Sequence, residues 1–235
     1  MCLREAIVTV CNIRYSFGFF NPQGIWLPLK DAGPKLGIDA SGIEKGLQPT
    51  AIAIDTRFRI LKEVVAEAKK RIAELLAIPT GQELRSSSVA LPDNVVYGTL
   101  AMVDAFFFES GSVRKLLERF YVGLLRRTRI QDGCESSASF QALVRATEQG
   151  FRWDSYLRAN RDQYTHQTAP YPAILFSDQA STQPKLVFES DPEVYLDQRK
   201  FDYVLQGLEA LARRCREDLI AQVRNARASG GGRDR

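Results

Sequence analysis

The sequence contains a single histidine, His166, and four cysteines, none of which forms a Cys-x-x-Cys pair. Zinc sites and di-iron helical bundles need several Cys, His or Glu-x-x-His ligands, so we expect no metal site. The cysteines are widely scattered, which fits reduced thiols in a cytosol better than a disulfide framework. They are Cys2, Cys11, Cys134 and Cys215.

Other signatures are missing as well. There is no Gly-rich phosphate loop, which argues against an NTPase or a dehydrogenase and against a nucleotide cofactor. No stretch approaches the roughly 18–20 apolar residues of a membrane span. The apolar run that follows Arg4 and Glu5 ends before Cys11 and is shorter than the core of a signal peptide. We therefore expect a cytoplasmic protein with no membrane segment and no cofactor.

What is present is typical of a globular chain. The 235 residues are 45% hydrophobic and 26% charged, enough for one domain, or one domain and an appendage, with a substantial core. The formal net charge of +4 permits an anionic partner such as RNA. It is too small to indicate a dedicated DNA-binding protein.

Two long helices are predicted from apolar residues that recur every three or four positions. The first helix covers about 51–78, and the last covers about 193–226. Such regular apolar faces need a neighbouring helix to pack against. The first face consists of Ile54, Phe58, Leu61, Val65, Ala68, Ile72 and Leu75, and the second of Phe201, Val204, Leu208, Leu211, Cys215, Leu219 and Val223.

Two further helices are expected in the middle of the chain. The first, capped by Asp93 or Asn94 and ending near Glu109, is apolar on nearly all sides and should be central. Its carboxylate Asp104 must therefore be paired, protonated or at the edge of a site. Ser-Gly-Ser at 110–112 is expected to interrupt the helix. The basic helix that follows, 113–129, is either a solvated face or an RNA track.

Together these elements predict an all-α fold, a bundle of five to six helices with one small β-hairpin. The helical domain should span 51–226, with the hairpin at about 173–189. The segment 1–50, rich in Gly, Pro and aromatic residues, should be irregular and pack on the bundle, or serve as an arm that folds against a partner subunit. The Gly-rich tail 227–235 should be disordered.

The sequence around the histidine, Leu-Arg-Ala-Asn-Arg-Asp-Gln-Tyr-Thr-His, carries candidate chemistry. On a helix Asp162 and His166 are four residues apart and share a face, and Pro170 ends the helix soon afterwards. Histidine is the usual proton shuttle near neutral pH, and the planar fork of Arg161 matches a phosphate. Such a pair can cleave RNA without a metal ion. The histidine removes the 2′-hydroxyl proton, the arginine stabilises charge on the phosphate, and Asp162 can fix the imidazole tautomer.

The pattern of Arg161, a polar residue and then His166 resembles the signature of the HEPN superfamily. The resemblance implies a compact helical bundle that forms a homodimer, with the two motifs facing each other across a composite cleft. Many members are metal-independent endoribonucleases of toxin–antitoxin and phage-defence systems, and others are non-catalytic binding modules. The family often adds a polar or acidic residue from an earlier helix, and Asp104 or Glu109 could fill that place. Asn160 and Tyr164 flank the motif as supporting polar residues.

Simpler interpretations stay open. His166 could stabilise the carboxyl end of a helix, Arg161 could pair with Asp154 or Glu148, and Asp162 could pair with Arg158. Two functions follow from the sequence. One is a homodimeric endoribonuclease that acts on RNA, with an antitoxin or another protein as partner. The other is a non-catalytic helical dimer that binds a nucleotide, a nucleic acid or a protein.

Overall fold

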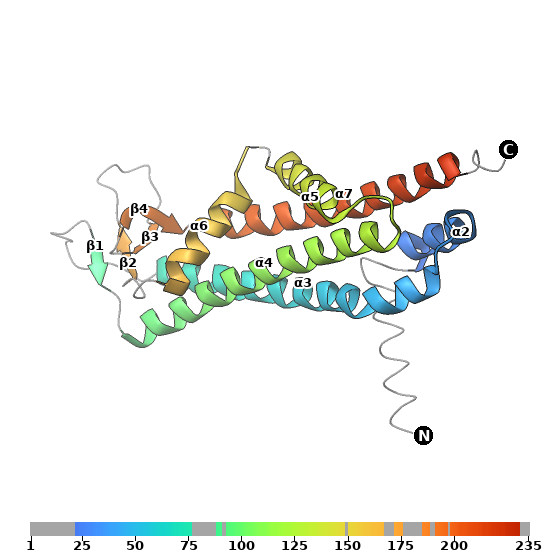
Figure 1. Ribbon diagram of the computed structural model, residues 1–235. Helices are drawn as coiled ribbons and strands as arrows, with labels where there is room; N and C mark the ends of the chain where they lie inside the picture. The colour runs from blue at the N-terminus through green and yellow to red at the C-terminus, as the bar shows by residue number, and fades with distance from the viewer. Residues whose placement is uncertain are drawn as a thin grey trace, which may run out of the picture. The chain divides into compact units, whose positions relative to one another are not determined.

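The described part of the protein, a computed structural model, is predominantly helical, as the sequence predicts (Figure 1). Among the described residues there are six α-helices, one π-helical turn and four β-strands. The structure describes residues 22–76, 88–90, 93–148, 150–166, 172–175, 185–188, 191–196 and 198–230.

The helices vary greatly in length. They are η1 (Pro22–Trp26), α2 (Leu27–Leu36), α3 (Ala40–Leu76), α4 (Asp93–Arg127), α5 (Gly133–Thr147), α6 (Trp153–His166) and α7 (Gln198–Gly230). The chain divides into two compact units, and α3, α4 and α7 contribute residues to both. Unit 1 takes the described residues within Met1–Phe58, Ser112–Gln149 and Leu208–Arg235, and unit 2 takes those within Arg59–Gly111 and Gly150–Gly207.

Residues 22–36 and 40–50 are helical, so the prediction of an irregular segment was wrong there. Pro28 lies in the first turn of α2, where a helix tolerates proline because the N–H has no intrahelical partner. Gly37 ends α2 in the left-handed region, with φ 63°. The first part of the predicted irregular segment, residues 1–21, lies outside the described residues.

The junction between α2 and α3 is a close helix–helix contact. Asp39 caps α3, since its Oδ1 accepts a hydrogen bond from the Gly42 N–H at 2.9 Å. A Cβ at Gly33 would lie 3.2 Å from the Ala40 Cβ, so a larger residue would push the two helices apart. Gly33 therefore lies inside α2 and permits this contact.

The core of unit 1 is formed by apolar faces of α2, α3, α4, α5 and α7. Trp26 packs edge-on against Phe120, with ring centroids 5.7 Å apart. Leu47 lies over Gly123, where a Cβ would come within 3.2 Å of its Cδ2. The carboxyl-terminal part of the predicted α7 face is fully buried here, which confirms that prediction, and its residues are Leu208, Leu211, Cys215, Leu219 and Val223.

The core of unit 2 joins α3, α4, α6 and α7. Phe106 and Phe201 pack edge-on with centroids 4.5 Å apart, and the partly exposed pair Lys69 and Asp202 forms an ion pair at 2.7 Å. The predicted α3 face is buried at Leu61, Val65, Ala68 and Ile72 in this unit and at Ile54 in unit 1, while Phe58 is half-buried.

The middle of the chain forms one continuous helix, α4, and the predicted interruption at 110–112 was wrong. Ser110 is fully buried within it. A single glycine in a helix interior costs about 1 kcal/mol relative to alanine, which packing of a long helix readily offsets. Gly111 has a packing role that is described with the site.

Unit 2 also contains a four-stranded antiparallel sheet in the order β1-β2-β3-β4. The strands β2 and β3 pair within the range where the sequence predicts a hairpin, with Ala173 opposite Val187. Sequence reading did not predict β1 or β4. Residues 193–196 belong to β4, so the last helix begins at Gln198 rather than at about 193, and it ends at Gly230 rather than at about 226. The strands are β1 (Ser88–Ala90), β2 (Pro172–Leu175), β3 (Lys185–Phe188) and β4 (Asp191–Leu196).

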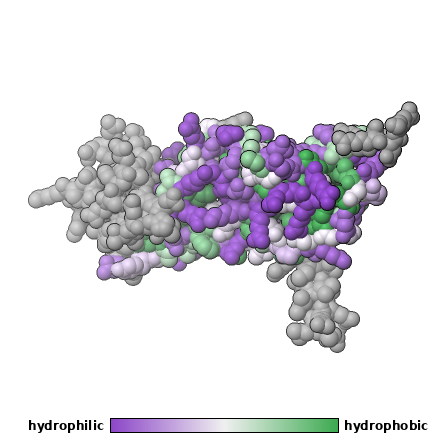
Figure 2. Space-filling model, in the orientation of Figure 1, coloured by the Kyte–Doolittle hydropathy of each residue, from purple (hydrophilic) through white to green (hydrophobic). Residues whose placement is uncertain are grey.

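The visible surface of the described residues is mostly hydrophilic, with smaller hydrophobic areas between the charged side chains (Figure 2). This fits helices that turn their apolar faces inward. Within the described ranges, no helix combines the length and the apolar character that crossing a membrane requires.

Candidate functional site

The motif helix α6, which carries Arg161, Asp162 and His166, packs within unit 2 through one apolar face. Trp153 and Leu157, four residues apart, are each 1% exposed, and Asn160 continues the same face at 6%. The helix starts after Gly150, which has φ 83°. Asp154 in the first turn pairs with Arg158 at 2.7 Å, an arrangement that suits the positive amino end of a helix. The buried face of Trp153, Leu157 and Asn160 fixes the rotation of α6 and hence the direction of its last two turns.

Arg161 packs along α4 at Gly111. A Cβ at Gly111 would lie 3.3 Å from the Arg161 Cδ and 3.5 Å from both Nε and Nη1. The missing side chain therefore leaves room for the arginine against the helix backbone. One turn earlier on α4, Phe107 meets Tyr156 of α6 at 6.2 Å between ring centroids. Phe107 and Gly111 thus form the α4 surface that receives α6.

Polar groups are buried near this contact. Glu109 and Ser110, the two residues before Gly111, are 7% and 0% exposed. Asn160, next to Arg161, donates from Nδ2 to the Tyr156 carbonyl at 2.8 Å. The Ser110 Oγ and the Asn160 Oδ1 are buried without a hydrogen bond among the described residues. Buried polar atoms left without a partner each cost about 1–3 kcal/mol, and a bound water, an ion or a functional role can account for such an atom.

Three predicted site residues lie where only the backbone is described. Asp162, Tyr164 and His166 are in the final turns of α6, which ends at His166. Their side chains lie outside the described part of the structure. A histidine at the end of a helix is where the sequence predicts it, while its approach to Arg161 stays a prediction.

Asp104 lies in water rather than within the core. The expectation that this carboxylate is paired, protonated or at the edge of a site assumed a helix that is apolar on nearly all sides, and its site role stays a prediction. Asp104 is in fact exposed, as are Ala101 and Phe108 on the same face of α4. A carboxylate in water needs no partner. Of the two acidic residues considered on the earlier helix, Glu109 is the buried one.

Sequence reading missed the role of Gly111, which it took as a helix break. The available signal was a lone glycine between two apolar helical patterns, which also indicates close approach by another group. Among the aromatic residues around the start of α6, Trp153 is buried. The ring centroid of Phe151 lies 5.4 Å from that of Tyr156 and 5.3 Å from that of the exposed Tyr203.

A second polar cluster lies in unit 1. The Tyr121 hydroxyl donates to the Asp218 Oδ2 at 2.5 Å, and Gln222 donates to the same oxygen at 2.6 Å and to the Tyr121 hydroxyl at 3.2 Å. Burial and then the bond to Asp218 raise the pKa of Tyr121, and burial raises the pKa of Cys215 well above that of an ordinary thiol. Tyr121 therefore stays a hydrogen-bond donor, and Cys215 stays a thiol that is a poor nucleophile.

Comparison of the chain with protein-family models finds no match, and neither do comparisons with curated proteins and with solved structures. Within the described residues, His, Cys, Asp and Glu side chains form no group of three or more that could hold a metal ion. The likeness of Arg161, Asp162 and His166 to the HEPN signature therefore stays a prediction, and the function is inferred from this chain's own residues.

Proposed function

We propose that the chain is a HEPN-like endoribonuclease that cleaves RNA without a metal ion, as a homodimer in the cytoplasm. The observation that supports this most is the position of Arg161. It sits in a space provided by Gly111, beside buried polar residues, five residues before the histidine that ends α6. A guanidinium whose stem is held by packing is pre-organised to stabilise charge on a phosphate.

In this proposal His166 takes the proton of the RNA 2′-hydroxyl. The 2′-oxygen then bonds to phosphorus, the bond from phosphorus to the 5′-oxygen breaks, and water supplies a proton to the leaving oxygen. Arg161 neutralises the charge that develops on the phosphoryl oxygens, and Asp162 orients the imidazole. The products are a 2′,3′-cyclic phosphate and a 5′-hydroxyl. Glu109 and Asn160 act as positioning residues.

We further propose a setting in toxin–antitoxin or phage defence, with an antitoxin as protein partner.

The test is incubation of the purified chain with single-stranded RNA in excess EDTA. We expect cleavage with 2′,3′-cyclic phosphate ends. Loss of a charge-stabilising donor typically costs 10²–10³-fold in rate, and loss of a general base 10²–10⁴-fold. The variants Arg161→Ala and His166→Ala should each lose at least about 100-fold, and Arg161→Lys should lose most activity because it lacks the planar fork.

The matched control is Arg158→Ala, an exposed arginine one turn earlier on α6. It removes the same charge and should retain most activity. Unchanged cleavage in both the Arg161→Ala and His166→Ala variants would refute the proposal, as would cleavage that stops in EDTA.

A second candidate function is a non-catalytic helical dimer that binds a nucleotide, nucleic acid or protein. The packing of Arg161 along α4 favours it, because a half-buried arginine can also serve only to hold two helices together. This candidate predicts a stable dimer with no RNA cleavage. It further predicts that Arg161→Ala lowers the free energy of unfolding, whereas His166→Ala does not.

A further inference from the structure

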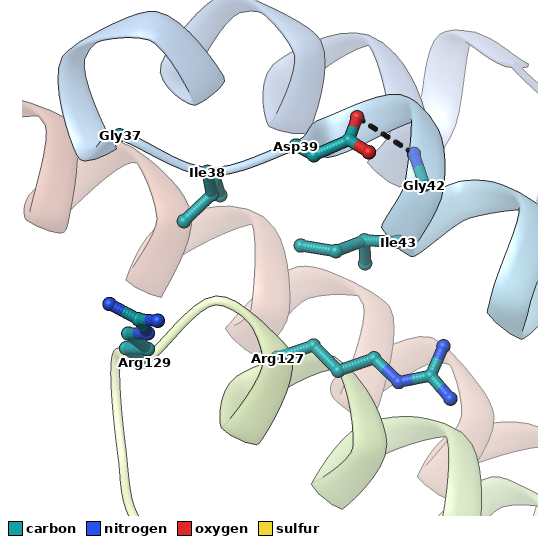
Figure 3. Close-up of a pocket in the computed structure, with 7 residues that line it drawn as sticks. All are labelled: Gly37, Ile38, Asp39, Gly42, Ile43, Arg127 and Arg129. Atoms are coloured by element: carbon teal, nitrogen blue, oxygen red, sulfur yellow. Dashed lines mark hydrogen bonds between the residues drawn. The ribbon is translucent and has the colours of Figure 1, made fainter.

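A pocket of about 330 Å³ opens in unit 1 between the α2–α3 junction and the carboxyl end of α4. Its size falls within the range of small-molecule sites, about 300–1,000 Å³. Figure 3 shows Asp39 on one side, Arg127 and Arg129 on the other, and the apolar side chains of Ile38 and Ile43 between them. The pocket therefore offers an apolar surface with charged groups at its edges.

Arg127 occupies a space that a glycine provides. A Cβ at Gly46 would overlap the Arg127 Nη1 and lie 3.2 Å from its Cζ. The guanidinium thus rests against the backbone of α3, and any residue larger than glycine at position 46 would displace it. Such close seating gives an exposed side chain a preferred position.

Arg129 stands where glycine is the usual residue. Its N–H bonds to the Arg126 carbonyl at 3.1 Å and the Ile130 N–H bonds to the Leu125 carbonyl at 3.2 Å, which is the Schellman ending of a helix. Arg129 accordingly has φ 56°. A non-glycine residue in this region costs about 1–2 kcal/mol. An arginine here gives up that stability while it places a guanidinium at the pocket.

The charges at the pocket do not cancel. Two guanidinium groups and one carboxylate line it, a net charge of +1. Among the described residues neither Arg127 nor Arg129 forms an ion pair. Asp39 already accepts the Gly42 N–H, and it repels an anion from its own side. An anionic group is therefore attracted to the arginine side, and hydrogen-bond donors of the same ligand suit Asp39.

We propose that this pocket binds a small organic phosphate, of which a nucleoside monophosphate is the type. The phosphate lies at the seated Arg127 guanidinium, and the exposed side chain of Arg129 rotates toward it, because guanidinium forks match phosphate oxygens. The body of the ligand covers Ile38 and Ile43, and its hydroxyl or amino groups face Asp39. This site is independent of the proposed cleavage activity, because none of its residues belongs to the motif helix.

The test is calorimetric titration of the full chain with AMP and UMP, and with adenosine and inorganic phosphate for comparison. We expect AMP or UMP to bind, and adenosine and phosphate to bind at least about tenfold more weakly. A charge-assisted hydrogen bond is worth about 1.5–3 kcal/mol, so Arg127→Gln and Arg129→Gln should each weaken binding by about 10–100-fold. Arg119→Gln, an exposed arginine of the same helix outside the pocket, changes net charge equally and should alter affinity less than about twofold.

A second variant separates a built site from general attraction to positive charge. Gly46→Ala keeps every charge but displaces the Arg127 guanidinium, and should weaken AMP binding by about tenfold or more. Three results would overturn the proposal. The first is the absence of AMP and UMP binding, the second is equal affinity in the Arg127→Gln and Arg119→Gln variants, and the third is binding of a 5′-phosphorylated DNA oligonucleotide without binding of either nucleotide.

Discussion

Gly207 of α7 lies directly beneath the indole of Trp153, and replacing it by alanine is a sharp test of how α6 packs. A Cβ at position 207 would lie 2.5 Å from the Trp153 Cγ and 2.7 Å from its Cδ2. Trp153 is 1% exposed, so its ring is enclosed on its other sides. The ring would have to retreat by about 1 Å to reach an ordinary contact distance of about 3.5–4.0 Å.

The expected destabilisation is the difference of two effects. Insertion of an extra methyl group into a packed core costs about 1–3 kcal/mol, and a rigid, enclosed indole places this site toward the upper end of that range. Alanine is better than glycine in a helix interior by about 1 kcal/mol. The free energy of unfolding of Gly207→Ala should therefore fall by about 1–2 kcal/mol.

Urea unfolding followed by tryptophan fluorescence and circular dichroism measures this change. The matched control is Gly46→Ala, also in a long helix, where the added methyl meets only the end of the exposed Arg127 side chain, which can be displaced into water. That variant should be as stable as the unaltered protein or more stable by up to about 1 kcal/mol. Equal stabilisation by both substitutions would show that Trp153 does not pack against Gly207, and the reasoning would fail.

Three other predictions concern unit 1. Asp132→Ala removes the capping box of α5 and should lower the free energy of unfolding by about 0.5–2 kcal/mol in the same assay, whereas Asp132→Asn should restore most of it. Tyr121→Phe removes one hydrogen bond to Asp218 and should lower the free energy of unfolding by about 1–2 kcal/mol. The loss is limited because Asp218 keeps its bond to Gln222. Folding raises the pKa values of Tyr121 and Cys215 above their ordinary 10.0 and 9.0. The free energy of unfolding should therefore fall as pH rises above about 9–10, and it should fall less in Tyr121→Phe. An identical pH dependence in the variant and the unaltered protein would contradict the raised pKa of Tyr121.

The long helices could be predicted because their apolar periodicity persists over many turns. Errors arose where a local signal competed with tertiary packing. Pro34 and Pro49 lie inside helices although proline usually ends them. Asp132 starts α5 by a capping box with Glu135, a pattern that is visible in the sequence but is absent from the helices predicted above.

The candidate site was only partly accessible to sequence reasoning. A short motif singles out Arg161 and His166 by residue type and spacing, and the helix that carries them is as predicted. The contact of Arg161 with Gly111 joins residues far apart in the chain, and no local pattern contains it. For the same reason sequence reasoning could not have paired Arg127 with Gly46.

The discontinuous make-up of unit 1 has a consequence for the order in which the protein is made and folds. Phe120 and Tyr121 leave the ribosome long before Asp218 and Gln222, with which Tyr121 forms its hydrogen bonds. Until residues 208–230 emerge, the inward face of α4 lacks the helix whose Asp218 and Gln222 bind Tyr121. Nascent chains should therefore expose apolar surface late in synthesis, and the closing contacts, with their large sequence separation, should make folding slow.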